Sequence, residues 1–281
     1  MSLFEGTELR RSAGTFGVPL AASWCAAGFL LLHWGIGLLV QVAPGAARDI
    51  VSVGAVQLLV MGGASWGLMV TYGSRATAAP GFLEFSRFFA LGRPSLRTIT
   101  LGALVGLGIK FPADGVRALT ERLFPTPEVT LAAQAELLRH ETPAQMLALV
   151  LVIGVLAPCV EELFYRGGIY RLLVQSRGVI TASAFTLVAF TLSHAAARDW
   201  PALLIVAFVL TLLRVRSGTL WPALVAHIAF NSATLLALFT GRSEVLDPFQ
   251  VGPWGVIAGV VLSVGLLARL RAESASGRRH A

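Results

Sequence analysis

Residues 158–168 read Pro-Cys-Val-Glu-Glu-Leu-Phe-Tyr-Arg-Gly-Gly, and they follow a run, residues 144–157, in which Gln145 is the one strongly polar side chain. Glu161 and Glu162 therefore stand where a membrane-spanning helix would face lipid. An ionisable side chain at membrane depth costs about 2.5–3.5 kcal/mol on insertion scales, so such residues face a bundle interior or a wet cavity. The pair predicts a functional site inside a membrane helix.

The composition of the whole chain is that of a polytopic membrane protein. Of its 281 residues, 56% are hydrophobic and 13% are charged, and the mean hydropathy is +0.75. The basic residues are almost all Arg and are scattered through short segments, so we expect no nucleic-acid partner. Cys25 and Cys159 lie in apolar runs and are expected to be small buried hydrophobic residues. We predict an all-α transmembrane bundle that forms a single integral membrane domain, 1–281.

Apolar runs long enough to cross a bilayer, about 20 residues each, predict the membrane helices. They lie near 18–42, 50–72, 97–112, 143–160, 179–196, 201–213, 218–240 and 250–269, which makes eight. The first run is too long for a signal-peptide core, so we expect it to be retained. With both termini in the cytoplasm, the inner segments hold 15 of the 22 Lys and Arg residues and the outer segments hold 7, which agrees with the positive-inside rule.

Three further segments have a predicted conformation. Residues 80–93 carry an apolar stripe and a basic face, which is typical of a helix that lies in the membrane interface. Residues 113–141 form the longest polar segment and are expected outside the membrane. Thr142, Pro143 and Gln145 give a helix start, with Thr as the N-cap and Gln three residues later.

The spacing of the charged residues assigns different environments to the two glutamates. Glu162 and Arg166 are four residues apart in the order that favours an ion pair on one helix face. Glu161 points about 100° away and has no local counter-charge, so it is the better candidate for a general base. The alternative is that all three side chains form one buried ion network with a structural role.

Two more polar pairs lie in otherwise apolar helices. Phe190 and His194 share a face of the fifth span, and His227 and Asn231 share a face of the seventh. Buried polar groups need partners where no water is available, so we expect these side chains to meet the glutamates around a wet cavity. Ser193 points to a different face from its neighbour His194, which argues against a serine nucleophile. The remaining histidines, which we expect to be structural or exposed, are His33, His140 and His280.

The three motifs together, Glu161-Glu162-x-x-x-Arg166, Phe190-x-x-x-His194 and His227-x-x-x-Asn231, resemble the CPBP family of intramembrane proteases. That family includes the CaaX prenyl endopeptidases and bacteriocin-processing relatives. The similarity covers about residues 144–238, within a motif-bearing core of about 143–240. The resemblance implies that Glu161 and His194 activate a water, that His227 and Asn231 stabilise the oxyanion, and that Glu162, Arg166 and Phe190 support them.

The sequence leaves two questions open, the need for a metal and the class of protein. A metal-free glutamate mechanism needs no cofactor, but a zinc site formed by Glu161, His194 and His227 is an alternative, although the compact His-Glu-x-x-His signature is absent. A proton-coupled transporter or a non-catalytic immunity protein could use the same buried carboxylates. Pairing of Glu161 with His194, together with a second donor pair, is required for hydrolysis and not for transport.

The partners follow from the depth of the site. We expect a membrane-embedded or membrane-anchored protein or peptide as substrate, in contact with the lipid bilayer. Arg over Lys and abundant Ala indicate a GC-rich bacterial genome, so we place the chain in a bacterial cytoplasmic membrane, with C-terminal sorting or precursor peptides as substrates.

One geometric condition adjusts the fourth span. If it ended at Val160, Glu161 would lie at the cytoplasmic edge of the membrane. His194, fifteen residues into a fifth span that runs outward, would lie about 22 Å higher at a rise of 1.5 Å per residue. We therefore expect the fourth helix to run from Pro143 to about Val174, kinked or restarted at Pro158. The side chains of Glu161 and His194 should then lie within about 8 Å, the reach of two hydrogen bonds through one water.

Overall fold

The computed structural model of the chain describes residues 15–46, 49–73, 81–194, 196–241 and 252–276, and every element in these ranges is helical. In chain order the elements are α1 (Val18–Val42), α2 (Ile50–Gln57), the π-helical turn η3 (Leu58–Gly62), α3 (Gly63–Tyr72), α4 (Phe82–Phe88), α5 (Leu96–Leu123), α6 (Glu128–Leu137), α7 (Pro143–Leu149), the π-helical turn η4 (Val150–Leu156), α8 (Ala157–Glu162), the π-helical turn η5 (Leu163–Ile169), α9 (Tyr170–Leu192), the short 3-10 helix η6 (Ala197–Asp199), α10 (Trp200–Ser217), α11 (Trp221–Phe239) and α12 (Pro253–Ser276).

The described helices include six that are long and apolar enough to cross a membrane, and a shorter apolar one at Pro253–Arg269. The chain is therefore an all-α integral membrane protein, as predicted. The observed bounds Val18–Val42 and Ile50–Tyr72 coincide with the first two predicted spans. One candidate, Pro143–Leu192, is 50 residues long and contains the fourth predicted span and most of the fifth. The predicted count of eight and the orientation of the termini stay predictions.

The 50-residue element reverses direction at Gly178. Gly178 has φ 82° and ψ 169°, the one non-helical conformation inside α9. A straight helix would separate Tyr165 from Phe190 by about 37 Å over 25 residues, yet their ring centroids lie 5.5 Å apart. The fourth helix thus continues three residues beyond the predicted Val174, to Arg177, and the fifth begins at Val179.

The helix neither stops nor restarts at Pro158, which corrects one of the two predicted forms, a restart; the other, a kink at Pro158, stays a prediction. Residues 156 and 157 on its N-terminal side keep helical dihedral angles. The π-helical turns η4 and η5 lie on either side of α8, and a π-helical turn accommodates an extra residue without ending the helix. Pro158 has no N–H to donate, and the change in hydrogen-bond register at these turns accommodates it without ending the helix.

The predicted helix start at Pro143 is confirmed. The hydroxyl of Thr142 accepts a hydrogen bond from the backbone N–H of Gln145 at 3.2 Å, and the side chain of Gln145 accepts one from the N–H of Thr142 at 3.0 Å. This reciprocal arrangement satisfies two N–H groups that a helix start otherwise leaves without partners.

The third span is longer than predicted, and the segment after it is less irregular. α5 continues through Pro112 to Leu123, so residues 113–123 belong to this helix and not to an outer loop. Lys110 and Asp114, four residues apart on either side of Pro112, form an ion pair at 2.7 Å. Because the two charges pair with each other, both side chains can lie in this helix. α10 likewise extends the predicted 201–213 to Trp200–Ser217.

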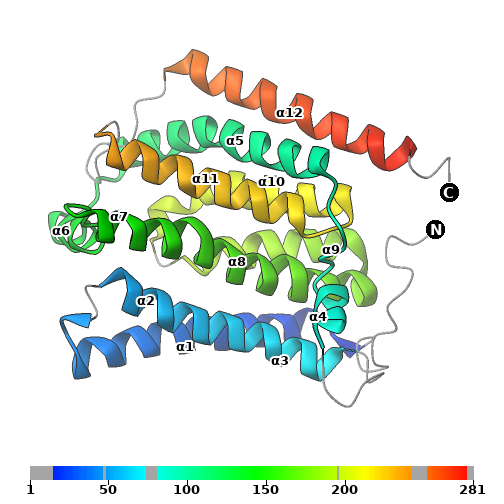
Figure 1. Cartoon of the computed structure of the whole chain (residues 1–281), viewed down its shortest axis with the longest axis horizontal. Coiled ribbons are helices and arrows are strands. Elements are labelled where there is room, and N and C mark those ends of the chain that lie inside the picture. Colours follow the sequence, from blue (N-terminus) through cyan, green and yellow to red (C-terminus); the bar gives the residue numbers. More distant parts are fainter. Residues whose placement is uncertain (1–14, 47–48, 74–80, 195, 242–251, 277–281) are drawn as a thin grey trace.

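The interfacial segment forms only a short helix, α4, at one end of the bundle (Figure 1). Phe82 and Leu83 are exposed, whereas Phe88 and Phe89 are buried in the core. The guanidinium of Arg171 donates hydrogen bonds to the carbonyls of Arg87 and Phe88, which fixes the C-terminal end of α4.

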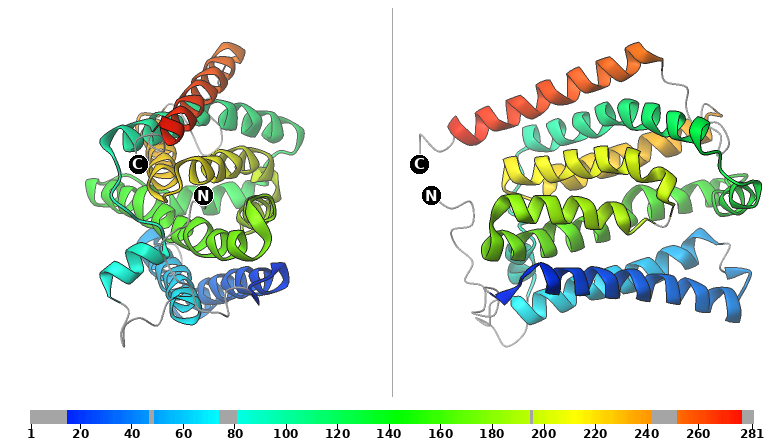
Figure 2. Two further views of the ribbon diagram at one scale, coloured as in Figure 1. Left: turned by 90° about the vertical axis from the view of Figure 1, so that its right-hand side faces the viewer. Right: turned by 180° about the vertical axis from the view of Figure 1, so that it is seen from behind.

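Two apolar cores flank the central helix α8. One core gathers side chains of α1, α3, α4, η5 and α9 and includes Val160 of α8, and the other gathers those of α5, α10, α11 and α12. Figure 1 shows α8 between α2 on one side and α11 on the other, and α8 contacts both. The view from behind and the end-on view in Figure 2 show the same order of layers. The glutamates of α8 can therefore meet side chains from two different parts of the chain.

Candidate active site

Glu162 is held from two sides. Its Oε1 accepts hydrogen bonds from Nη1 of Arg166 at 2.8 Å and from Nδ1 of His227 at 3.1 Å. Both Glu162 and Arg166 are fully buried, and the guanidinium of Arg166 lies 4.3 Å from the ring centroid of Phe190. The predicted ion pair is confirmed, and Phe190 contacts it as a cation–π partner.

Glu161 faces α2, which lies on the other side of α8 from α11 (Figure 1). Its Oε1 accepts a hydrogen bond at 2.8 Å from Nε2 of Gln57, the last residue of α2. Its Oε2 lies 3.9 Å from Nε2 of His227, beyond hydrogen-bond length. The rotation of about 100° between adjacent helical residues thus directs Glu161 toward α2 while Glu162 faces α11.

His227 contacts both carboxylates through its two ring nitrogens. Glu162 is an ionised acceptor because it pairs with Arg166, so Nδ1 of His227 carries the hydrogen of the 3.1 Å contact. The Nε2 atom is then directed to the side of Glu161. One histidine on α11 therefore connects the buried ion pair to the second glutamate.

His194 lies at the C-terminal end of α9, where its Nδ1 donates to the carbonyl of Phe190 at 2.9 Å. This bond leaves Nε2 as the free acceptor of the ring. The ring centroid of Phe190 lies 4.9 Å from that of His194 and 5.9 Å from that of His227. Among the described contacts, no direct hydrogen bond or ion pair joins His194 to Glu161, and the predicted water between them stays a prediction.

Asn231 supplies a donor that the fourth helix lacks. At the end of η4 the N–H of Ala157 bonds to the carbonyl of Val152, five residues back. In that register the next donor is position 158, a proline without an N–H, and the next acceptor is Ile153. Nδ2 of Asn231 donates to the carbonyl of Ile153 at 2.8 Å. Since an amide has two N–H groups, one remains for other use.

Gln57 is the site residue that the three sequence motifs did not predict. It lies in the second span, 104 residues before Glu161, and outside the three motifs. The signal was present, because Gln57 is the one amide in residues 50–72, as Asn231 is in its helix. A lone amide in an apolar helix requires a partner.

The remaining polar candidates are engaged locally. Nδ1 of His33 contacts the carbonyl of Phe29, and Nδ1 of His140 contacts that of Leu138. Oγ of Ser193 donates to the carbonyl of Phe190. His280 lies outside the described residues.

A cavity of about 330 Å³ opens beside the site, between α1 and α9. Tyr165 and Ser193 line it, next to the Phe190 and His194 contacts, and Cys25 lines it from α1. Val188 and Leu192 also line it and are about half exposed, so it opens on the surface of the bundle. The cavity is apolar, and none of Glu161, His194, His227 and Asn231 lines it.

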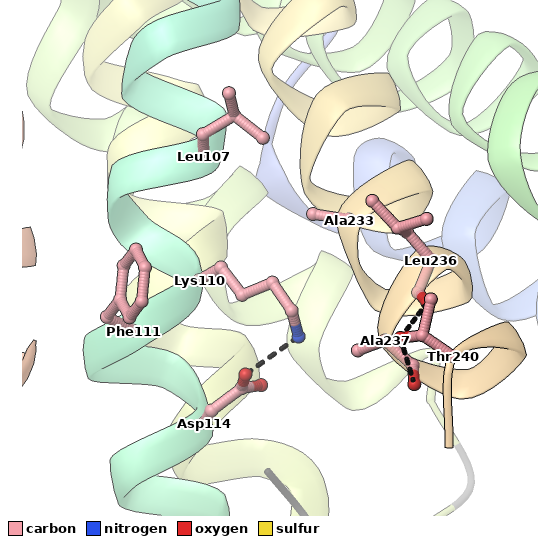
Figure 3. A pocket seen from close by; sticks show the side chains of 8 residues that line it. All are labelled: Leu107, Lys110, Phe111, Asp114, Ala233, Leu236, Ala237 and Thr240. Atoms are coloured by element: carbon pink, nitrogen blue, oxygen red, sulfur yellow. Dashed lines mark hydrogen bonds and ion pairs between the residues drawn. The ribbon is translucent and has the colours of Figure 1, made fainter. Parts of the chain in front are cut away.

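A larger cavity of about 530 Å³ lies elsewhere, between α5 and α11. Figure 3 shows Lys110 pointing into it and bonded to Asp114. Nζ of Lys110 also donates to the hydroxyl of Thr234 at 3.2 Å. None of the glutamates and histidines of the candidate site lines this cavity, so we treat the ion pair as a structural contact.

The three predicted zinc ligands, Glu161, His194 and His227, do not gather into one cluster in the described part of the chain. Among the described residues, no group of three or more His, Cys, Asp and Glu side chains is close enough to hold a metal ion. Glu161 and His227 approach each other, and the bond from Nδ1 of His194 to the carbonyl of Phe190 leaves its Nε2 open, so the zinc alternative is left to experiment.

The comparisons with known proteins agree with the motifs. Residues 143–233 match the family described as "Rce1-like: Type II CAAX prenyl endopeptidase Rce1-like". This segment contains all the predicted catalytic and supporting residues, and the match confirms the resemblance to the CPBP intramembrane proteases. No curated protein and no solved structure matches the chain significantly.

Proposed function

We propose that this integral membrane protein, whose residues 143–233 carry the Rce1-like domain, is an intramembrane endopeptidase that uses a glutamate as its general base. Glu161 and His194 activate the water, and His227 and Asn231 donate to the oxyanion. The observation that carries the proposal is the arrangement of the two carboxylates. Glu162 is locked by Arg166 and His227, while Oε2 of Glu161 lies near His227 without a direct hydrogen bond.

Hydrolysis begins with removal of a proton from water. Oε2 of Glu161 is the acceptor, and Nε2 of His194 orients the same water by accepting its second hydrogen. The water oxygen bonds to the scissile carbonyl carbon, and the carbonyl oxygen becomes the oxyanion. Glu161 then returns the proton to the leaving nitrogen as the C–N bond breaks. General acid–base assistance of this kind contributes about 100- to 10,000-fold in rate.

The oxyanion needs donors that are fixed before the reaction starts. The second N–H of Asn231 is one, because the first is held by Ile153. His227 is the other when its ring is doubly protonated, because Nδ1 already carries the hydrogen bonded to Glu162 and Nε2 must carry a second one to donate. Loss of one such donor typically lowers the rate by about 100- to 1,000-fold.

The substrate class follows from the surroundings of the site. A peptide bond must reach a centre enclosed by apolar helices, so the substrate is a membrane-embedded or membrane-anchored protein or peptide. The apolar cavity beside Tyr165 and Ser193 provides a route from the lipid side. We place the protein in a bacterial cytoplasmic membrane and expect C-terminal sorting or precursor peptides among its substrates.

Mass spectrometry of membrane proteins tests the proposal. Cells that carry Glu161→Ala should accumulate a precursor that keeps its C-terminal segment, and wild-type cells should not. Glu136→Ala is the matched control, because Glu136 is an exposed carboxylate on α6 that pairs only with Arg139 among the described contacts. An identical peptide profile for Glu161→Ala and wild type would overturn the proposal.

A chelation experiment on the purified protein tests the metal-free mechanism. Activity should survive prolonged treatment with a strong zinc chelator, and the protein should hold no stoichiometric zinc. Loss of activity on chelation and its return on adding zinc would instead assign the metal alternative.

A further inference from the structure

We propose that Gln57 is a positioning residue for the general base. Its amide fixes the carboxylate of Glu161 so that one oxygen is occupied and the other is presented to the reacting water. The inference rests on the proposed function and adds a residue outside both the recognised motifs and the Rce1-like segment.

The contact itself is short and specific. Nε2 of Gln57 donates to Oε1 of Glu161 at 2.8 Å, within the usual range for an N–H to oxygen hydrogen bond. It is the one hydrogen bond to the Glu161 carboxylate among the described contacts. Both side chains are partly buried, so the bond lies in surroundings of lower dielectric than bulk water, where a hydrogen bond is stronger.

The backbone around Gln57 is fixed by its packing. Gly54, one turn earlier on α2, has no room for a side chain, because a Cβ there would lie 2.4 Å from Cγ1 of Val152. This close approach joins α2 to η4, the turn that leads into α8. Gln57 then lies on the same face as Gly54, since residues three apart share a helix face. The π-helical turn η3 begins directly after Gln57, and such turns occur frequently at functional sites.

The bond decides which oxygen of Glu161 acts. The terminal torsion of a glutamate side chain is broad and roughly two-fold, so an unrestrained carboxylate rotates freely between its two oxygens. With Oε1 held by Gln57, Oε2 lies 3.9 Å from Nε2 of His227. Its lone pairs remain open to a water molecule, and the base has one defined orientation toward the oxyanion side of the site.

The N-terminal helices thereby acquire a part in the chemistry. Residues 143–233 supply the carboxylates, the histidines and Asn231, but the orientation of Glu161 comes from α2. The active site is completed at the contact between the N-terminal helices and α8, where Figure 1 shows the two layers side by side.

The first test compares the kinetics of full-length Gln57→Met and wild-type protein on a precursor peptide from the profiling experiment. Methionine keeps the length of the side chain and removes the donor. We expect kcat to fall about 10- to 100-fold with little change in KM, since the lost bond is to a charged group that acts in the chemical step. Gln41→Met on α1, at an exposed position, is the matched control and should behave as wild type.

A second measurement does not depend on cleavage. The apolar carbodiimide DCCD modifies protonated carboxyl groups in membrane proteins, and mass spectrometry reports the rate at Glu161. Removal of the amide should accelerate labelling of Glu161 about 10-fold, because the ionised form loses its donor. If Gln57→Met does not fold, Gln57→Asn keeps the amide but is one methylene too short and serves in both tests.

The outcomes separate the two proposals. Wild-type levels of kcat and of Glu161 labelling in Gln57→Met would overturn the positioning role. If Gln57→Met speeds the labelling of Glu161 but neither the variant nor the wild type cleaves any peptide, the contact between Gln57 and Glu161 stands and the proposed peptidase function is rejected. Equal losses in kcat and thermal stability for Gln57→Met and Gln41→Met would reduce Gln57 to a packing residue.

Discussion

Replacing Gly106 by alanine should force α5 and α11 apart. A Cβ at Gly106 would lie 2.1 Å from the carbonyl oxygen of Ala226 and 2.8 Å from its Cα. Ordinary contact begins at 3.4 Å, so the two backbones must separate by 3.4 minus 2.1, or about 1.3 Å. Backbone atoms cannot rotate away as a flexible side chain can. The strain therefore falls on the whole helix pair.

The expected loss follows from two opposing effects. Overpacking of a filled interior costs about 1–3 kcal/mol, and a contact with backbone belongs at the upper end. Alanine in place of glycine returns about 1 kcal/mol through its helix propensity. The net loss of stability is about 2 kcal/mol. Ala226 directly precedes His227, so the displacement also moves the proposed oxyanion donor, and a misplacement of about 1 Å in an active site lowers rates by about 100-fold.

Thermal unfolding in detergent and peptide cleavage by the same preparation measure both effects. Gly63→Ala on α3 is the matched control, because a Cβ there meets nothing within 4 Å. It should be as stable as wild type or slightly more stable, with full activity. If Gly106→Ala unfolds at or above the wild-type temperature and keeps its activity, the close approach of α5 and α11 is not as the structure places it.

Three further predictions test separate parts of the molecule. Arg166→Met leaves the buried Glu162 without its cation and should destabilise the protein by about 3–5 kcal/mol, measured by denaturant unfolding; an unchanged midpoint would contradict a fully buried pair. Thr142→Ala removes the N-cap and should cost about 1 kcal/mol by the same measurement, with activity unchanged; a large loss of activity would place the helix start nearer the site. In a Cys159→Ala background, which leaves Cys25 as the one thiol, a bulky apolar thiol reagent should block cleavage, because Cys25 lines the cavity between α1 and α9; full cleavage by a protein whose Cys25 is labelled, as seen by mass spectrometry, would reject the cavity as the substrate route.

The sequence by itself determined the features that depend on neighbours along the chain. Hydropathy gave the membrane class and the first two spans to the residue. Spacing of four residues predicted the Glu162–Arg166 pair, and the Thr142 and Gln145 side chains predicted the helix start. These patterns work because helical geometry fixes which residues share a face or a turn. They also selected the motif residues, whose catalytic roles stay predictions.

The tertiary structure alone decided how the helices face one another. The contact of Gln57 with Glu161, the two-sided contact of His227 and the bond from Asn231 to Ile153 each join separate helices. Hydropathy says that a helix spans the membrane but not how it is rotated about its axis. The π-helical turns make the difficulty worse, since each adds a residue to one turn and rotates everything that follows. The pair of glutamates was visible in the sequence, but the side chain that orients Glu161 could be assigned only after α2 had been placed against α8.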